Sequence, residues 1–157
     1  MSDSEDKKGP GVKYPPPLIV STLILLAYAL EFLASLPIIA GAAPWPSGSI
    51  VLAIALLMAA IAALQFRRAK THLEPWKPTS SIIKRGVYRY SRNPIYLAFC
   101  IATLGIGMIL NSWWVVGAVL PQVYLLQHFV IAREETYLQT KFGDEYLAYQ
   151  KKVRRWI

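Results

Sequence analysis

Four long apolar stretches, separated by shorter polar segments, dominate the pattern of the chain. The first covers residues 18–39, which is longer than the apolar core of a signal peptide. The others cover residues 49–66, 94–110 and 113–132. Each has about the length that an apolar helix needs to cross a bilayer. The pattern therefore predicts an all-α integral membrane protein with about four transmembrane helices.

The polar segments suggest how these helices are joined. Residues 1–17 are mixed in charge and end in three prolines, which predicts a flexible tail ahead of a single membrane domain over residues 18–157. Asn111 and Ser112 form a minimal turn, so the third and fourth helices should be an antiparallel hairpin. Pro121 is expected to kink the fourth helix, because proline interrupts helical hydrogen bonding.

A further helix is predicted at the carboxyl end. Residues 133–141 should extend the fourth helix, and Gly143 offers a stop before Asp144, the expected N-cap of the next one. Aromatic and apolar positions in this terminal segment recur at helical spacing on one face: Tyr146, Tyr149, Val153 and Trp156. This amphipathic helix can either lie on the membrane or cover a cofactor, and the sequence leaves both open.

Charge gives the expected orientation. The chain is 55% hydrophobic yet carries a net charge of +8. Its seventeen basic residues all lie before residue 18, between residues 67 and 92, or from residue 133 onward. By the positive-inside rule, both termini and the loop over residues 67–93 should be cytoplasmic, in a cell (inner) membrane. This topology explains the positive charge, so no nucleic-acid partner is expected, whereas membrane lipids are.

Several kinds of chemistry find no support. A single cysteine, Cys100, cannot form an intrachain disulfide, and two widely separated histidines give no metal-ligand spacing. Gly105 and Gly107 favour close helix packing rather than phosphate binding, because no strand precedes them. Glu31 lies deep in the first span, where it favours a polar contact between helices over catalysis.

The most informative segment covers residues 86–96, GVYRYSRNPIY. Asn93 and Pro94 suit the N-cap and first position of the third helix, whose free N–H groups attract anions. Arg89 and Arg92 on the same approach can hold a carboxylate or phosphate. The alternative is a simple helix start with arginines that anchor lipid phosphates.

Glu134 and Glu135 follow the fourth span on the same side of the membrane as Asn93. A carboxylate placed there can bind an ammonium group or a ribose diol, and nearby tyrosines can supply aromatic faces. The alternative is a solvated acidic pair that closes a membrane helix. On residue chemistry alone, both interpretations remain.

The order GVYRYSRNPIY, then a helical hairpin, then EETYLQTKFGDEYLAYQKKV, resembles the isoprenylcysteine carboxyl methyltransferase family and its phospholipid methyltransferase relatives. The resemblance covers about residues 71–153. It implies an integral membrane enzyme that binds S-adenosyl-L-methionine without a Rossmann domain, in a region formed by residues 71–96 and 133–157.

The resemblance also implies individual roles. The Arg-His-Pro-x-Tyr motif of the family falls on residues 92–96, with Asn93 in place of the histidine, and Ala98 stands where a glycine is common. A substrate-binding arginine of the prenylcysteine enzymes would fall on Val130, so Arg133 is the nearest candidate. The implied catalytic residues are Arg133 and Glu135. The implied cofactor-binding residues are Ser80, Ser81, Ile82, Ile83, Tyr88, Arg92, Asn93, Pro94, Ile95, Tyr96 and Glu134.

The expected activity is methyl transfer from S-adenosylmethionine to a small or lipophilic acceptor at the cytoplasmic face. An acceptor that must lose a proton would need a base, for which Glu135 or His128 is the candidate. Two other interpretations remain open: an NADPH-dependent membrane sterol or steroid reductase, and a non-catalytic scaffold that binds lipid.

Overall fold

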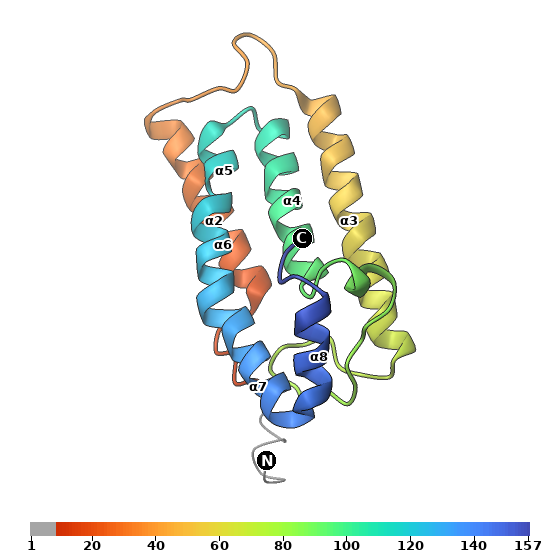
Figure 1. Cartoon of the computed structure of the whole chain (residues 1–157). Helices are drawn as coiled ribbons and strands as arrows, with labels where there is room; N and C mark the ends of the chain where they lie inside the picture. The colour runs from red at the N-terminus through yellow and green to blue at the C-terminus, as the bar shows by residue number, and fades with distance from the viewer. Residues whose placement is uncertain (1–8) are drawn as a thin grey trace.

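The computed structural model describes residues 9–157, which form helices and loops and contain no strand. Figure 1 shows the long helices running alongside one another, with α8 below α4. The elements in chain order are α2 (Pro16–Leu33), α3 (Trp45–Arg68), the 3-10 turn η1 (Gly86–Arg89), α4 (Pro94–Ile109), α5 (Trp113–Gly117), α6 (Val119–Leu125), the π-helical η2 (Leu126–Ile131), α7 (Ala132–Phe142) and α8 (Asp144–Lys152).

Three helical runs are long and apolar enough to cross a membrane: α2, α3 and the run Trp113–Phe142, which comprises α5, α6, η2 and α7. The predicted all-α membrane protein is thus confirmed. The third predicted span corresponds to α4, which is apolar but has only 16 residues. At 1.5 Å per residue it is about 24 Å long, somewhat less than the apolar thickness of a bilayer. Figure 1 shows α4 between α3 and the α5–α6 run, so neighbouring helices flank it on two sides.

The first span is shorter than predicted. The apolar pattern extends over residues 18–39, but α2 ends at Leu33. Pro37 cannot donate a backbone hydrogen bond to Leu33 and would crowd its carbonyl, so the helix must end before it. The carboxylate of Glu31 also accepts from the N–H of Leu36 at 2.8 Å, which replaces a helical partner. The second span, predicted over residues 49–66, is instead longer at both ends.

Glu31 has a structural role at the end of α2. One carboxylate oxygen accepts from the hydroxyl of Ser35 at 2.6 Å, and the other accepts from the hydroxyl of Ser112 at 2.6 Å. Ser112 in turn caps α5 by accepting from the N–H of Val115. Glu31 therefore joins the end of α2 to the turn between α4 and α5, which agrees with its interpretation as a polar contact between helices.

Close approach of α3 and α4 depends on two glycines. A Cβ on Gly105 would lie 2.7 Å from the backbone nitrogen of Leu52 and 3.0 Å from the carbonyl oxygen of Gly48. Real Cβ atoms do not approach backbone atoms that closely, so only glycine fits at this crossing. The packing interpretation of Gly105 agrees with this contact.

The last long helical run is interrupted at Ala118, between α5 and α6. Pro121 has no N–H to donate to the carbonyl of Gly117, so the interruption stands where the predicted proline kink removes a helical bond. Further along, the π-helical turn η2 immediately precedes α7, which carries Glu134.

The terminal helix folds back onto the protein. Tyr146, Tyr149 and Val153 are buried and pack with Ile82. The sequence left open whether this face of α8 lies on the membrane or packs against the protein. In the structure it packs against the protein. The predicted N-cap is wrong by one residue: Gly143 occupies the N-cap with φ +49°, and Asp144 is the first helical residue. Glycine is favoured there because it tolerates positive φ.

Candidate functional site

The 3-10 turn η1 carries Tyr88 into the protein. Its ring packs edge to face on Phe66 of α3, with centroids 5.7 Å apart. The hydroxyl of Tyr149, from α8, donates to the carbonyl of Tyr88 at 2.6 Å. Tyr88 is thus held between α3 and α8 by residues that are distant from it in the sequence.

The approach to α4 is fastened by the carboxyl-terminal tail. The N–H of Arg92 donates to the carbonyl of Arg154 at 3.0 Å, and the side-chain amide of Asn93 donates to the carbonyl of Arg155 at 3.0 Å. The predicted N-cap position of Asn93 is confirmed, but its side chain is turned to the carboxyl-terminal tail and makes no capping hydrogen bond. The first N–H groups of α4 lack a side-chain cap, which leaves them suited to an anion.

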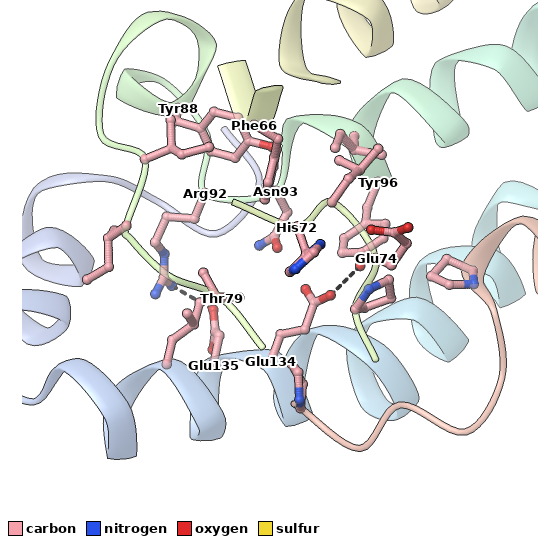
Figure 2. A pocket seen from close by; sticks show the side chains of 18 of the residues that line it. Phe66, His72, Glu74, Thr79, Tyr88, Arg92, Asn93, Tyr96, Glu134 and Glu135 are labelled. Atoms are coloured by element: carbon pink, nitrogen blue, oxygen red, sulfur yellow. Dashed lines mark hydrogen bonds and ion pairs between the residues drawn. The ribbon is translucent and has the colours of Figure 1, made fainter. Parts of the chain in front are cut away.

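Tyr96 and Glu134 connect α4 to α7. The phenol of Tyr96 donates to a carboxylate oxygen of Glu134 at 2.6 Å, as Figure 2 shows. The hairpin of helices predicted from the sequence does bring these residues together, because its two arms are antiparallel. One oxygen of Glu134 is engaged by this bond, and the side chain lines the cavity described below.

Glu135 is held by two arginines. Nη2 of Arg155 donates to one carboxylate oxygen at 2.6 Å, and its Nε donates to the other at 3.1 Å. Nη2 of Arg92 lies 3.2 Å from the same carboxylate, in a pair whose side chains are only 10% and 12% exposed. The charge of Glu135 in turn raises the pKa of Arg155 through their hydrogen bond.

Arg92 has unused hydrogen-bonding capacity. Its Nε and Nη1 are buried, and among the described residues neither has a hydrogen-bond partner. A buried charged donor without an acceptor is costly, so such groups usually mark a place for a ligand or water. These two atoms are the strongest sign that something anionic belongs beside Arg92.

These residues surround one cavity of about 260 Å³, close to the lower end of the range for small-molecule sites. Figure 2 shows its labelled side chains converging from several elements. The lining residues are Pro10, Pro16, Pro17, Phe66, His72, Leu73, Glu74, Pro75, Trp76, Thr79, Ser81, Ile82, Ile83, Tyr88, Arg92, Asn93, Ile95, Tyr96, Phe99, Glu134, Glu135, Leu138, Tyr146 and Tyr149.

Most of the candidate residues from the sequence meet at this cavity. Those that line it are Ser81, Ile82, Ile83, Tyr88, Arg92, Asn93, Ile95, Tyr96, Glu134 and Glu135. Residues far apart in the chain are thus brought around one space. Their individual roles remain predictions.

Three candidates do not line the cavity. Ser80 is exposed and fastens its loop, with its N–H donating to Thr71 Oγ1 at 2.9 Å. Pro94 is buried in the first turn of α4. Arg133 is exposed and donates to the carbonyl of Gly11 at 3.0 Å. The base candidate His128 also lies elsewhere, with Nδ1 2.9 Å from the carbonyl of Tyr124.

Sequence reasoning missed other lining residues. Tyr146 and Tyr149 stood out only as one face of an amphipathic helix, a pattern that does not say what the face contacts. His72 and Glu74 come from the loop after α3, where no periodicity pointed inward. Pro10 belongs to a segment expected to be a tail. The burial of the α8 face could have been suspected from its paired tyrosines, but the other positions carried no signal.

The lining tyrosines are neutral phenols near pH 7. Burial raises the pKa of Tyr88, as do the nearby charge of Glu134 and the presence of Tyr149. Burial, followed by the charge of Glu135, raises the pKa of Tyr146 to about 12. These side chains therefore offer hydroxyl donors and aromatic faces without adding negative charge.

Comparison with known proteins shows which family the chain belongs to. A model of the phospholipid methyltransferase family matches residues 44–145. A protein-S-isoprenylcysteine O-methyltransferase from Schizosaccharomyces pombe is 37% identical over 89 residues, which are 55% of this chain and 34% of that protein. An uncharacterized protein from Haemophilus influenzae is 60% identical over 35 residues, which are 22% of this chain and 56% of that protein.

The chain spans little more than half the length of one of these relatives and about a third of the other. The family match, in contrast, covers well over half of this chain and includes α3, η1, α4 and the carboxylates of α7. The resemblance stated from the motifs is thus confirmed. This chain belongs to the phospholipid methyltransferase family.

Proposed function

We propose that this chain is a membrane methyltransferase that binds S-adenosylmethionine and methylates a small or lipophilic acceptor at the cytoplasmic face. The observation that carries the proposal is the charge pattern of the cavity. Arg92, whose buried Nε and Nη1 have no hydrogen-bond partner among the described residues, and the carboxylate-bearing Glu134 line the same cavity. The methionyl end of S-adenosylmethionine carries a carboxylate and an ammonium group, so it suits a site with both charges.

The residues present fit this cofactor. Arg92 and the uncapped N-terminus of α4 would hold the carboxylate. Glu134 would hold the ammonium group or a ribose hydroxyl, with its orientation set by the hydrogen bond from Tyr96. The backbone of Ile82 and Ile83, together with the lining tyrosines, would enclose the adenosine.

When bound, S-adenosylmethionine supplies a methyl group on a sulfonium that is open to in-line displacement. The chain contributes position and exclusion of water, which are the main demands of this transfer. Phe66, Phe99 and Leu138 supply apolar surface to the cavity wall. Such surface disfavours water around the reacting atoms.

Glu135 is best assigned as a positioning residue. Both of its oxygens already accept from arginines, so it orients Arg92 instead of taking a proton from the acceptor. An ionised carboxylate acceptor needs no base, whereas an amine, thiol or phenol can need one. His72 lines the cavity and is the side chain placed to serve such an acceptor.

The proposal is tested by calorimetric titration of the detergent-purified protein with S-adenosylhomocysteine and, separately, with NADPH. Saturable binding of S-adenosylhomocysteine alone is expected. Binding of NADPH alone would replace the proposal with the reductase interpretation. Binding of neither would favour a lipid-binding scaffold.

Glu134→Gln is expected to weaken S-adenosylhomocysteine binding by about 1 to 3 kcal/mol, because the hydrogen bond loses its charged acceptor. The same titration measures the change. Glu145→Gln is the matched control: Glu145 is exposed, pairs with Lys84 at 2.7 Å and does not line the cavity, so its loss should leave the affinity unchanged. Equal affinity of native protein and a folded Glu134→Gln variant would remove Glu134 from the site.

The proposed orientation predicts labelling of introduced cysteines. Ser47 and Ser80 are both exposed, near opposite ends of α3, and the native Cys100 is buried. In intact cells, a membrane-impermeant maleimide should label Ser47→Cys and not Ser80→Cys, whereas permeabilised cells should show labelling of both. Labelling of Ser80→Cys alone would invert the orientation and move the site to the outer face.

A further inference from the structure

Residues 9–17, here named the N-terminal strap, are held at the end of the helical bundle that contains the cavity. Figure 1 shows the start of the described chain, in red, near α7. Val12 is only 6% exposed and belongs to the same apolar cluster as Tyr96, Val130 and Ile131. The strap thus adds a side chain to the apolar cluster that includes Tyr96, whose phenol contacts Glu134.

Two further contacts hold the strap. Nη1 of Arg133 donates to the carbonyl of Gly11 at 3.0 Å. On the opposite side, Gly9 has φ +59°, and a Cβ there would lie 2.8 Å from the backbone of Lys77. The strap therefore passes close to the loop after α3 on one side and contacts α7 on the other.

The strap separates two hollows. Pro10 lines the cavity that contains Arg92 and Glu134, and it also lines a shallower groove on the side of Arg133. Pro16 and Pro17 continue the wall of the cavity at the start of α2. Removing the strap would open this wall from Pro10 to Pro17.

We propose that the N-terminal strap closes the cofactor cavity and that Arg133 is the positioning residue that holds it closed. This inference rests on the proposed function, because the ligand behind the strap is taken to be S-adenosylmethionine. It gives Arg133 a role through the carbonyl of Gly11 and not through the reacting atoms. A closed wall keeps water out and slows escape of the ligand.

Closure and binding must be linked. If the closed strap strengthens binding, bound ligand must favour the closed strap by the same factor. Lys13 is exposed within the strap, between buried Val12 and the start of α2. A protease cuts such a segment only after it leaves the surface, so cleavage after Lys13 reports opening.

The experiment uses the full chain in detergent and an endoprotease that cuts only after lysine. Replacing arginine with methionine changes no cleavage site, and Arg133→Lys adds one site whose product has a different mass. Cleavage after Lys13 is followed by intact mass, with and without S-adenosylhomocysteine. Arg133→Met should speed cleavage by about three- to tenfold, as expected for the loss of one hydrogen bond from an exposed side chain. It should weaken S-adenosylhomocysteine binding by a similar factor, and Arg133→Lys should restore part of both effects.

Two further variants distinguish release of the strap from a general effect of losing a basic side chain. Val12→Ser leaves Arg133 intact and loosens the strap from its apolar contact, so it should also speed cleavage and weaken binding. Arg154→Met removes an exposed basic side chain from the same end of the protein and should do neither. S-adenosylhomocysteine should protect Lys13 in the native protein.

Each other outcome is decisive. An unchanged cleavage rate in both Arg133→Met and Val12→Ser would show that these residues do not hold the strap and would overturn the proposal. Faster cleavage with unchanged S-adenosylhomocysteine affinity would show that the strap does not close the cofactor cavity. If the native protein bound no S-adenosylhomocysteine, the proposed function would fail. In that case, faster cleavage of both variants would still show that the strap is held as inferred.

Discussion

Arg92→Met should weaken binding of S-adenosylhomocysteine by about 2 to 5 kcal/mol, the range for removing one partner of a buried, charged contact. The large effect is expected because Arg92 lines the cavity, and its buried Nε and Nη1 have no hydrogen-bond partner in the part of the chain that the structure describes. Titration calorimetry measures the affinity, and thermal unfolding in the same detergent shows whether the variant is folded.

Arg155→Met is the matched control for this substitution. Arg155 also pairs with Glu135, at 2.6 Å, but it is 38% exposed and does not line the cavity. Both variants take one arginine from the same carboxylate, so their effects on stability should be similar, whereas only Arg92→Met should abolish tight binding. Equal losses of affinity would mean that Arg92 acts through Glu135 alone and makes no contact with the cofactor.

Gly105→Ala should destabilise the fold by about 3 kcal/mol, at the upper end of the usual cost of overpacking. The added Cβ would lie within 3.0 Å of backbone atoms on α3, and backbone cannot move aside as a flexible side chain can. Separation of α3 and α4 would also move Phe66 relative to Tyr96, both of which line the cavity. The expected readout is a lower midpoint of thermal unfolding together with weaker S-adenosylhomocysteine binding.

Gly117→Ala is the control with the same chemical change. Beyond its chain neighbours and its own helix backbone, no atom of the described residues lies within 4 Å of a Cβ at Gly117, which is exposed in α5. Alanine is about 1 kcal/mol better than glycine inside a helix, so this variant should be neutral or slightly more stable. Similar destabilisation by both substitutions would show that the α3–α4 contact is not the cause.

Much of the fold followed from local pattern. Apolar stretches of membrane-spanning length identified an all-helical membrane protein, because helices satisfy their own backbone hydrogen bonds in lipid. The end of α2 did not follow from this pattern, because Glu31 competes with the backbone there and a hydropathy pattern does not show this competition. The short turn at Asn111 and Ser112 predicted an antiparallel hairpin, and this hairpin does bring Tyr96 to Glu134.

Part of the site could be predicted from the sequence. Arg92, Tyr96 and Glu134 were chosen for residue chemistry and for order in the chain, and all three line one cavity. Asn93 was expected to cap α4, but its amide instead donates to the carbonyl of Arg155, 62 residues later in the chain. This competing acceptor belongs to the carboxyl-terminal tail, so the sequence around Asn93 could not have identified it.

The sequence by itself determined the helical membrane class, the family and the two clusters of charged and aromatic residues around Arg92 and Glu134. These features depend on short-range pattern and on motif order. The tertiary structure alone decided how those residues are surrounded: two arginines bind Glu135, Arg133 lies outside the cavity against Gly11, and two Arg92 donors have no partner among residues 9–157. Such contacts join segments far apart in the chain, and only folding brings their atoms within hydrogen-bond distance.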